Sequence, residues 1–357
     1  MPEHPFADRR RRLAESFERL KLPALAVSHL PNVRYLTGFT GSNALLLLTD
    51  RDALLFTDPR YELQAQDEVD CKVQIVRGPL WPALGKVLAR RKIAGLGIES
   101  EYVSYEIWRM IAKEPLRLKG VSGLVEALRA VKSPEEIESI RASVILNSKA
   151  YERGLKVIKP GVRERDIAAE LEYQMKRLGA EGPAFETIVA AGPRSALPHA
   201  RPTGQPVNAN QIVLVDMGAN LEGYASDMTR VVHVGKPPRA TERMYKAVLE
   251  AQLAAIDKVR GGVKAADVDQ AARGTLKRWK LDHVFQHSTG HGLGLEIHEG
   301  PRIGKGAETV LQPGMVVTIE PGAYVEDYGG VRIEDTVVVT AAGCEVLTPT
   351  RKELLVL

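Results

Sequence analysis

Val213-Leu-Val-Asp216-Met-Gly218-Ala-Asn-Leu-Glu222-Gly-Tyr224 is followed by Asp227-Met-Thr229-Arg-Val-Val232. The same pattern occurs again about a hundred residues later. There it reads Val317-Thr-Ile-Glu320-Pro-Gly322-Ala-Tyr-Val-Glu326-Asp-Tyr328, followed by Glu334-Asp-Thr336-Val-Val-Val339. In each copy a β-branched run ends at an acid, a glycine-containing turn reverses the chain, and a second β-rich run begins beside another acid. Each copy therefore predicts a β-hairpin with two carboxylates facing each other across it.

The four acids of the two predicted hairpins are Asp216, Asp227, Glu320 and Glu334. If the hairpins are related by an internal pseudo-symmetry and pack together, these acids converge. Four carboxylates share one desolvated pocket only when cations balance them, because each raises the pKa of the others. The alternative is that they are solvent-facing turn residues, but their apolar flanks are typical of buried strands. The pattern therefore predicts a metal site.

The segment between the hairpins is rich in histidine and glycine. It reads His287-Ser-Thr-Gly290-His291-Gly292-Leu-Gly294-Leu-Glu-Ile-His298-Glu-Gly-Pro-Arg302. Glycines on both sides of His291 allow the backbone to approach a metal closely, so His291 is the best imidazole ligand, and the other histidines are candidates for handling protons. A phosphate-binding loop is the alternative, but the spacing of its glycines and its Gly-Lys-Ser/Thr ending are both missing.

The five candidate ligands, in order and in context, resemble the pita-bread-fold metallopeptidases. This family includes methionine aminopeptidase, aminopeptidase P, prolidase and the non-peptidase creatinase. The segments Pro198-His199-Ala-Arg-Pro202, His298-Glu299 and Gly330-Val-Arg332-Ile-Glu334-Asp335 resemble its proline-specific branch. The resemblance covers essentially the whole chain. It implies an α+β fold, in which a creatinase-like amino-terminal α/β domain precedes a pita-bread catalytic domain with a curved sheet around the metals.

The resemblance also implies how the site works. Asp227 and Glu334 would bridge two divalent metal ions, Asp216 would bind one of them, and His291 with Glu320 would bind the other. A mostly oxygen-rich ligand set favours Mn²⁺, with Co²⁺, Fe²⁺ or Zn²⁺ possible. A water between the metals would be the nucleophile and Glu320 its general base.

Proline-directed cleavage adds further demands. An Xaa-Pro bond is a tertiary amide whose departing nitrogen must be protonated, and His199 and His298 match family histidines suited to proton delivery and to holding the oxyanion. Arg302 is the candidate for binding the free carboxylate of a dipeptide. Arg332 is the competing candidate, but its place beside a metal ligand suits support of the cluster. His287 and Tyr224 are further candidates for binding substrate, although each could instead be structural, His287 as a hydrogen-bonded histidine and Tyr224 as a core tyrosine.

The predicted activity is therefore hydrolysis of Xaa-Pro bonds in a proline-containing dipeptide, as in prolidase. Aminopeptidase P activity on longer peptides is the alternative, and it would leave the metal chemistry unchanged. Two less favoured possibilities are a creatinase-like hydrolase acting on a non-peptide C–N bond and a silent binding module. The intact ligand set argues against the binding module.

Two domains are expected from the length of 357 residues, with boundaries 1–128 and 129–357. The first domain alternates predicted strands at 24–28, 44–49, 53–57, 73–76 and 94–99 with predicted helices at 8–20, 82–92 and 104–113. Ser133-Pro134-Glu135-Glu136 predicts a capped helix start. Long helices are expected at 134–157, 163–178, 240–259 and 264–280.

Composition excludes several classes of protein. Hydrophobic residues make up 44% of the chain and charged residues 26%, which is typical of a globular protein. The net charge is only +4, and basic residues are interspersed with acids, so nucleic-acid binding is not expected. No apolar run is long enough to cross a membrane, and the N-terminus lacks the pattern of a secretory signal, so we expect a cytoplasmic enzyme. The resemblance implies a homodimer.

Overall fold

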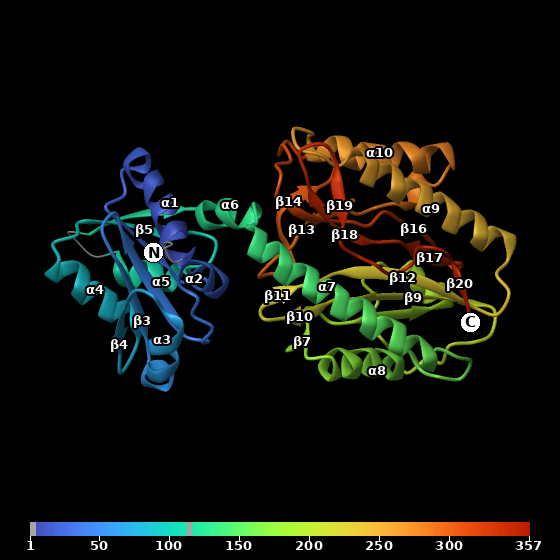
Figure 1. Cartoon of the computed structure of the whole chain (residues 1–357), viewed down its shortest axis with the longest axis horizontal. Coiled ribbons are helices and arrows are strands. Elements are labelled where there is room, and N and C mark those ends of the chain that lie inside the picture. The colour runs from blue at the N-terminus through green and yellow to red at the C-terminus, as the bar shows by residue number, and fades with distance from the viewer. Residues whose placement is uncertain (1–4, 113–115) are drawn as a thin grey trace. The chain divides into compact units, whose positions relative to one another are not determined.

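The computed structural model describes residues 5–112 and 116–357. The chain divides into two compact units, residues 1–129 and 130–357. Each unit has hydrophobic clusters of its own. Figure 1 labels the elements of both units. The predicted helix at 104–113 ends at a residue that lies outside the described ranges.

The first unit is built on a six-stranded mixed sheet with the strand order β4-β3-β2-β1-β5-β6. Its strands are β1 (Ala24–Val27), β2 (Ala44–Thr49), β3 (Ala53–Thr57), β4 (Lys72–Ile75), β5 (Gly95–Glu99) and β6 (Arg117–Val121). Its helices are α1 (Pro5–Leu20), α2 (Leu30–Thr37), α3 (Glu62–Glu68), α4 (Leu80–Arg90), α5 (Tyr105–Ile111) and α6 (Leu124–Ala130), which ends one residue into the second unit; a 3-10 turn, Pro59–Tyr61, precedes α3.

Strand β2 shows why this sheet is buried. Its apolar run is covered on both faces, as expected for a central strand between layers of helices. Leu45 and Leu47 pack with Leu84 of α4 in one cluster, whereas α1 and α2 also contact β2. The sequence did not predict α2, α3, β6 or α6, each of which is short and lacks a clear apolar period.

The second unit carries the predicted long helices. These are α7 (Pro134–Gly154), α8 (Glu164–Arg177), α9 (Arg239–Lys258) and α10 (Ala265–Arg278). The Ser133 hydroxyl accepts a hydrogen bond from the amide of Glu136, and the Glu136 carboxylate accepts one from the amide of Ser133, so the predicted capping box is confirmed. In the described part of the chain, no helix is both long and apolar enough to span a membrane.

The strands of the second unit form two sheets of four and five strands and two smaller ones. The four-stranded sheet has the order β20-β12-β9-β8 and the five-stranded sheet the order β14-β13-β15-β18-β19. The strands are β7 (Gly182–Pro183), β8 (Ile188–Ala191), β9 (Gln211–Met217), β10 (Ala219–Leu221), β11 (Tyr224–Ala225), β12 (Met228–Val234), β13 (Gly290–Gly292), β14 (Glu299–Ile303), β15 (Val316–Ile319), β16 (Gly322–Val325), β17 (Gly329–Arg332), β18 (Asp335–Val339), β19 (Cys344–Val346) and β20 (Leu355–Val356). Short 3-10 turns lie at Leu155–Val157, Gly192–Ala196 and Asp282–Val284.

The unit repeats one plan twice along the chain. The helix pair α7 and α8 precedes β7 to β12, and the pair α9 and α10 precedes β13 to β20. Within each pair the two helices pack on each other, and in Figure 1 the two pairs lie on either side of the strands of this unit. This arrangement bears out the pseudo-symmetry expected from the repeated sequence pattern.

Each expected hairpin proves to be interrupted. β9 pairs antiparallel with β12 and β15 with β18, but the segments between them form separate short pairs, β10 with β11 and β16 with β17. In the first repeat the break falls at Gly218, where a Cβ would lie 2.1 Å from the Ser226 carbonyl oxygen. In the second it falls at Pro321, which has no amide hydrogen to donate to the ladder.

Candidate metal centre

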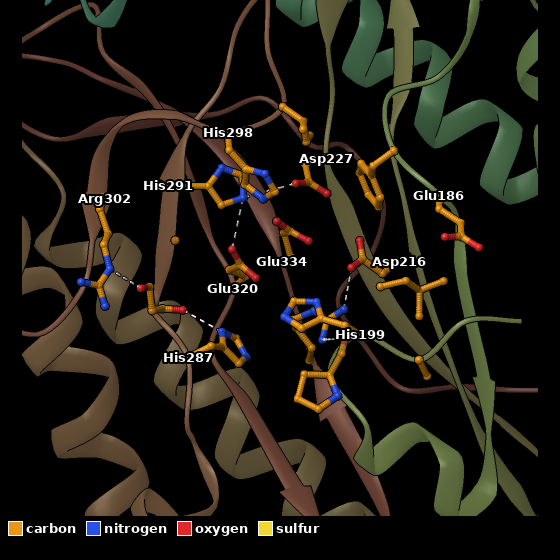
Figure 2. Close-up of a pocket in the computed structure, with 18 of the residues that line it drawn as sticks. Glu186, His199, Asp216, Asp227, His287, His291, His298, Arg302, Glu320 and Glu334 are labelled. Atoms are coloured by element: carbon orange, nitrogen blue, oxygen red, sulfur yellow. Dashed lines mark hydrogen bonds and ion pairs between the residues drawn. The ribbon is translucent and has the colours of Figure 1, made fainter. Parts of the chain in front are cut away.

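One pocket in the second unit collects most of the predicted site residues. It has a volume of about 660 Å³, and its lining includes Asp216, Asp227, Glu320, Glu334, His199, His287, His291, His298 and Arg302. Figure 2 shows the four acids and His291 near the middle of the pocket, with Arg302 toward one side and Glu186 toward the other. The cluster and Arg302 therefore share one cavity.

The ends of the two long strand pairs bring the four acids together. Asp216 is the penultimate residue of β9, and Asp227 immediately precedes β12. Glu320 immediately follows β15, and Glu334 immediately precedes β18. Each repeat thus contributes one acid from each of its paired strands, which is the convergence that the sequence pattern predicted.

His291 faces this cluster with one defined nitrogen. Its Nε2 lies 3.5 Å from Oδ2 of Asp227 and 3.4 Å from Oε1 of Glu320. Its Nδ1 lies 3.0 Å from the carbonyl oxygen of Gly292, which can only accept, so Nδ1 carries the hydrogen. Burial lowers the pKa of His291. The neutral ring therefore presents the lone pair of Nε2 to the carboxylates, as a metal ligand must.

Burial also perturbs the acids. It raises the pKa of Glu320 to about 7, although Arg332 acts in the opposite direction. It raises the pKa of Asp227 well above the usual range, with Glu334 as the next largest cause. It does the same for Glu334, with Glu320 adding to the effect. In the absence of a cation this cluster holds protons that exposed carboxyl groups would release.

The residues present fit divalent metal ions. One ligand atom each from Asp227, His291 and Glu334 lie within 4.8 Å of one another. One buried oxygen each of Asp216, Asp227 and Glu334 (Oδ1, Oδ1 and Oε1) finds no hydrogen-bond partner in the described part of the chain. Buried carboxylate oxygens without a donor are costly unless a cation binds them, so the cluster has the donor set and the unsatisfied atoms of a hard metal site.

Arg332 supports the acids from behind. Its Nη2 donates to Oδ2 of Asp216 at 2.5 Å, and its Nε donates to the Thr229 hydroxyl at 3.0 Å. The Thr229 hydroxyl in turn donates to Oε2 of Glu334 at 2.7 Å. The Arg332 side chain is only 4% exposed. It therefore fixes acids of both repeats and offsets part of their negative charge.

His287 lines the pocket with both ring nitrogens engaged. Its Nδ1 lies 2.8 Å from the carbonyl oxygen of Ser288 and its Nε2 lies 2.7 Å from the Tyr324 hydroxyl. That hydroxyl accepts from Nη1 of Arg332, and burial raises the pKa of Tyr324 to about 12, so it donates its own hydrogen to Nε2. Burial, with help from Arg332, lowers the pKa of His287 to about 4. His287 is thus a neutral ring held in one tautomer.

The other two predicted histidines are more open. His298 is exposed and stacks edge-on against His291, with ring centroids 4.4 Å apart. Burial, followed by the nearby imidazoles of His291 and His199, lowers the pKa of His298. His199 follows the 3-10 turn Gly192–Ala196 and is exposed at the pocket wall. Both rings are placed where a substrate could reach them.

Tyr224 requires a correction. It does not line the pocket, and its hydroxyl lies 3.1 Å from Oε1 of Glu136, the third residue of α7. Its ring packs against a buried cluster that includes Ile140 and Leu293. Tyr224 is close to Asp227 in sequence, but β11 ends at Ala225 and successive side chains of a strand point to opposite faces. Closeness in sequence therefore did not place Tyr224 in the pocket.

Sequence reasoning missed several residues of the site. The hydroxyl of Thr318 donates to Oε1 of Glu320 and accepts from the amide of His291. Glu186 and Arg201 form an ion pair of 3.2 Å in the pocket lining. The sequence did contain a pattern that could have indicated Thr229 as a site residue. Both repeats place a threonine two residues after the second acid, in Asp227-Met-Thr229 and Glu334-Asp-Thr336.

Comparison with known proteins agrees with this geometry. Residues 138–341 match the model of metallopeptidase family M24, and residues 9–131 match the creatinase/prolidase N-terminal domain. An Xaa-Pro dipeptidase of Pyrococcus horikoshii is 36% identical over 347 residues, which cover 97% of this chain and 98% of the relative.

Solved structures agree along nearly the whole chain. An Xaa-Pro dipeptidase from Bacillus anthracis has a TM-score of 0.96 at 35% identity, covering 99% of this chain and 100% of its own. An X-Pro aminopeptidase from Thermotoga maritima has a TM-score of 0.90 at 37% identity, covering 95% and 99%. The predicted pita-bread fold, with a creatinase-like domain before it, is confirmed, and the chain belongs to metallopeptidase family M24.

Proposed function

We propose that this metallopeptidase is an Xaa-Pro dipeptidase. The observation that carries the proposal is that one pocket holds both the carboxylate and imidazole cluster and the guanidinium of Arg302. The cluster suits hydrolysis of a peptide bond, and the guanidinium suits a free carboxylate a short distance beyond that bond. A substrate with both features in a small volume is a dipeptide.

Asp216, Asp227, His291, Glu320 and Glu334 would hold two divalent cations, and the oxygen-rich ligand set favours Mn²⁺. When bound, such cations acidify a coordinated water and polarise the scissile carbonyl. Glu320 is the candidate general base, because it lies in the cluster and its side chain is 15% exposed toward the pocket. Thr318 orients its carboxylate by donating to Oε1.

His298 and His199 are the candidates for handling the remaining protons. Cleavage of an Xaa-Pro bond requires a proton on the departing ring nitrogen, which has no hydrogen in the substrate. Both rings lie in the pocket wall and neither has a ring nitrogen hydrogen-bonded within the described residues, so each can face the substrate. His287 differs, because its nitrogens bind Ser288 and Tyr324, and it serves as a fixed wall of the substrate pocket.

A panel of substrates tests this function. Hydrolysis of an Xaa-Pro dipeptide, an Xaa-Pro-Yaa tripeptide and creatine would be measured in the presence of Mn²⁺, with wild type and Arg302→Ala. We expect the dipeptide to be the best substrate. Arg302→Ala should lower kcat/KM for it by about ten- to a hundredfold, since a charge-assisted contact is lost. The tripeptide, whose proline carboxylate is amidated, should be affected much less.

Aminopeptidase activity on longer peptides is the second candidate. Its support is the likeness to the X-Pro aminopeptidase of Thermotoga maritima, which has 37% sequence identity with this chain. A wild-type preference for the tripeptide, with Arg302→Ala indifferent to peptide length, would replace the dipeptidase assignment with this one. Turnover of creatine in preference to either peptide would refute both.

A further inference from the structure

Arg302 is supported by a hydroxyl from the neighbouring segment. The residue is exposed, and its Nε donates to Oγ of Ser288 at 2.7 Å. Figure 2 shows this bond beside the labelled Arg302. A long, exposed side chain loses rotamer freedom when it binds a ligand. A hydrogen bond made before binding reduces that loss, so Ser288 prepares Arg302 for its ligand.

The bond also selects which edge of the guanidinium is available. Arginine can bind a carboxylate through its two Nη atoms or through Nε and one Nη. Ser288 occupies Nε, and neither Nη atom of Arg302 has a partner within residues 5–112 and 116–357. The end formed by the two Nη atoms is therefore the edge left for a carboxylate.

Gly304 gives the guanidinium its room. A Cβ at this position would lie 3.0 Å from Nε of Arg302, 3.0 Å from Oγ of Ser288 and 3.2 Å from Cζ of Arg302. The backbone of Gly304 is not left-handed, so alanine is sterically allowed there by its conformation. A methyl group at this position would therefore crowd both the guanidinium and the hydroxyl.

The backbone around Ser288 is held in place on both sides. Arg273 of α10 donates to the carbonyl oxygens of Phe285 and His287 at 3.0 and 2.6 Å. The Thr289 hydroxyl donates to Asp269 of the same helix at 2.7 Å. Ser288 is thus a hydroxyl on a rigid segment, which is the condition for directing a flexible partner.

The same segment is connected to the metal cluster. The Ser288 carbonyl accepts from His287, whose other nitrogen accepts from Tyr324. Arg332 donates both to the Tyr324 hydroxyl and to Asp216. The support of Arg302 and a candidate metal ligand therefore belong to one hydrogen-bonded frame.

We propose that Ser288 is a positioning residue that determines specificity, because it turns the Nη edge of Arg302 toward the substrate's terminal carboxylate. This inference rests on the proposed dipeptidase function. It assigns the preference for a free carboxylate to the pair Ser288 and Arg302, with Gly304 as the space that permits it.

The test compares an Xaa-Pro dipeptide with its C-terminal amide, which lacks the carboxylate. The quantity measured is the ratio of kcat/KM for the dipeptide to kcat/KM for the amide. Ser288→Ala should lower this ratio by about three- to tenfold, mainly through KM for the dipeptide. Gly304→Ala, which keeps the hydroxyl but crowds the guanidinium, should lower it in the same direction. Gly343→Ala, where a Cβ meets nothing within 4 Å, is the matched control.

A double-mutant cycle completes the test. In an Arg302→Ala background, adding Ser288→Ala should change the ratio by less than about twofold, because the hydroxyl acts through Arg302. A normal ratio for Ser288→Ala alongside a reduced ratio for Arg302→Ala would overturn the inference and leave the dipeptidase function standing. An equal loss on both substrates, or a loss that persists without Arg302, would also overturn it. An unchanged ratio in Arg302→Ala would overturn the carboxylate anchor itself.

Discussion

The hydroxyl of Thr229 donates to Oε2 of Glu334 at 2.7 Å, so the first repeat fixes a candidate ligand supplied by the second. The second repeat makes a related contact to the first, because the hydroxyl of Thr336 donates to the carbonyl oxygen of Asp227 at 3.1 Å. This contact reaches the backbone of Asp227 and not its carboxylate. Each threonine follows an acid of its own repeat by two residues and bonds to the opposite repeat. These bonds hold the two halves of the acid cluster in register.

Thr229→Val should weaken metal binding. Valine keeps the volume but removes the hydroxyl that orients Glu334 and accepts from Arg332. Loss of such a supporting contact typically lowers metal affinity by about ten- to a hundredfold. Competition with a metal chelator would measure this affinity. The control is Thr275→Val, since within the described residues the Thr275 hydroxyl bonds only to Ala271 and Arg278 of α10. Equal affinities for the two variants would contradict the role of Thr229.

The metal-free protein should lose stability as the pH rises. Burial raises the pKa of Glu320 to about 7 and raises the pKa values of Asp227 and Glu334. Carboxyl groups in the unfolded chain titrate near about pH 4, so folding takes up protons above that value. This contribution is complete below about pH 4 and is lost as the pH rises through about 7.

Thermal unfolding at about pH 5.5 and about pH 8 would measure this loss, with and without Mn²⁺. Metal removal should lower Tm more at the higher pH, because cations then balance charges that protons no longer neutralise. Comparing Tm of the metal-bound and the metal-free protein at the same pH cancels the effect of groups that titrate elsewhere in the chain. An equal decrease in Tm at both pH values would contradict the coupling of these acids to the metal.

Lys132→Met should destabilise the second unit. Nζ of Lys132 lies 3.1 Å from Oε2 of Glu299, and the two side chains are only 2% and 6% exposed. Removing one partner of a buried ion pair typically costs about 3–5 kcal/mol of unfolding free energy. Adding Glu299→Gln should recover part of the loss.

Denaturant unfolding measures this loss against a matched pair. Lys264 and Glu308 form an ion pair of 2.7 Å, but their side chains are 52% and 79% exposed. Lys264→Met should therefore lower the free energy of unfolding much less than Lys132→Met does. Similar losses for Lys132→Met and Lys264→Met would show that burial does not set the strength of the first pair.

The sequence predicted much of this fold because its long elements carry clear patterns. The strands at 44–49 and 53–57 and the four long helices of the second unit agree with the structure to within a few residues. Repetition of the acid-bearing pattern predicted that the two halves of the catalytic unit are related. Short elements such as α2 and α3 escaped detection, because one or two turns carry too little periodic signal.

The candidate site was less predictable where contacts are long-range. The position of Arg332 beside Glu334 indicated a supporting role, but its partners Thr229 and Asp216 precede it by 103 and 116 residues, and no local pattern predicts those bonds. The same is true of Ser288, whose partner Arg302 follows 14 residues later. The roles of the individual site residues, the manganese, the homodimer and the cytoplasmic location stay predictions.

We propose that the acid cluster acts by holding metal ions during Xaa-Pro hydrolysis. The most direct measurement is dipeptide turnover by wild type and Glu334→Gln after metal removal and again after addition of Mn²⁺, with circular dichroism to confirm that both are folded. We predict that metal removal abolishes wild-type turnover and that Mn²⁺ restores it, whereas Glu334→Gln stays inactive although folded. Full turnover by metal-stripped Glu334→Gln would contradict the account.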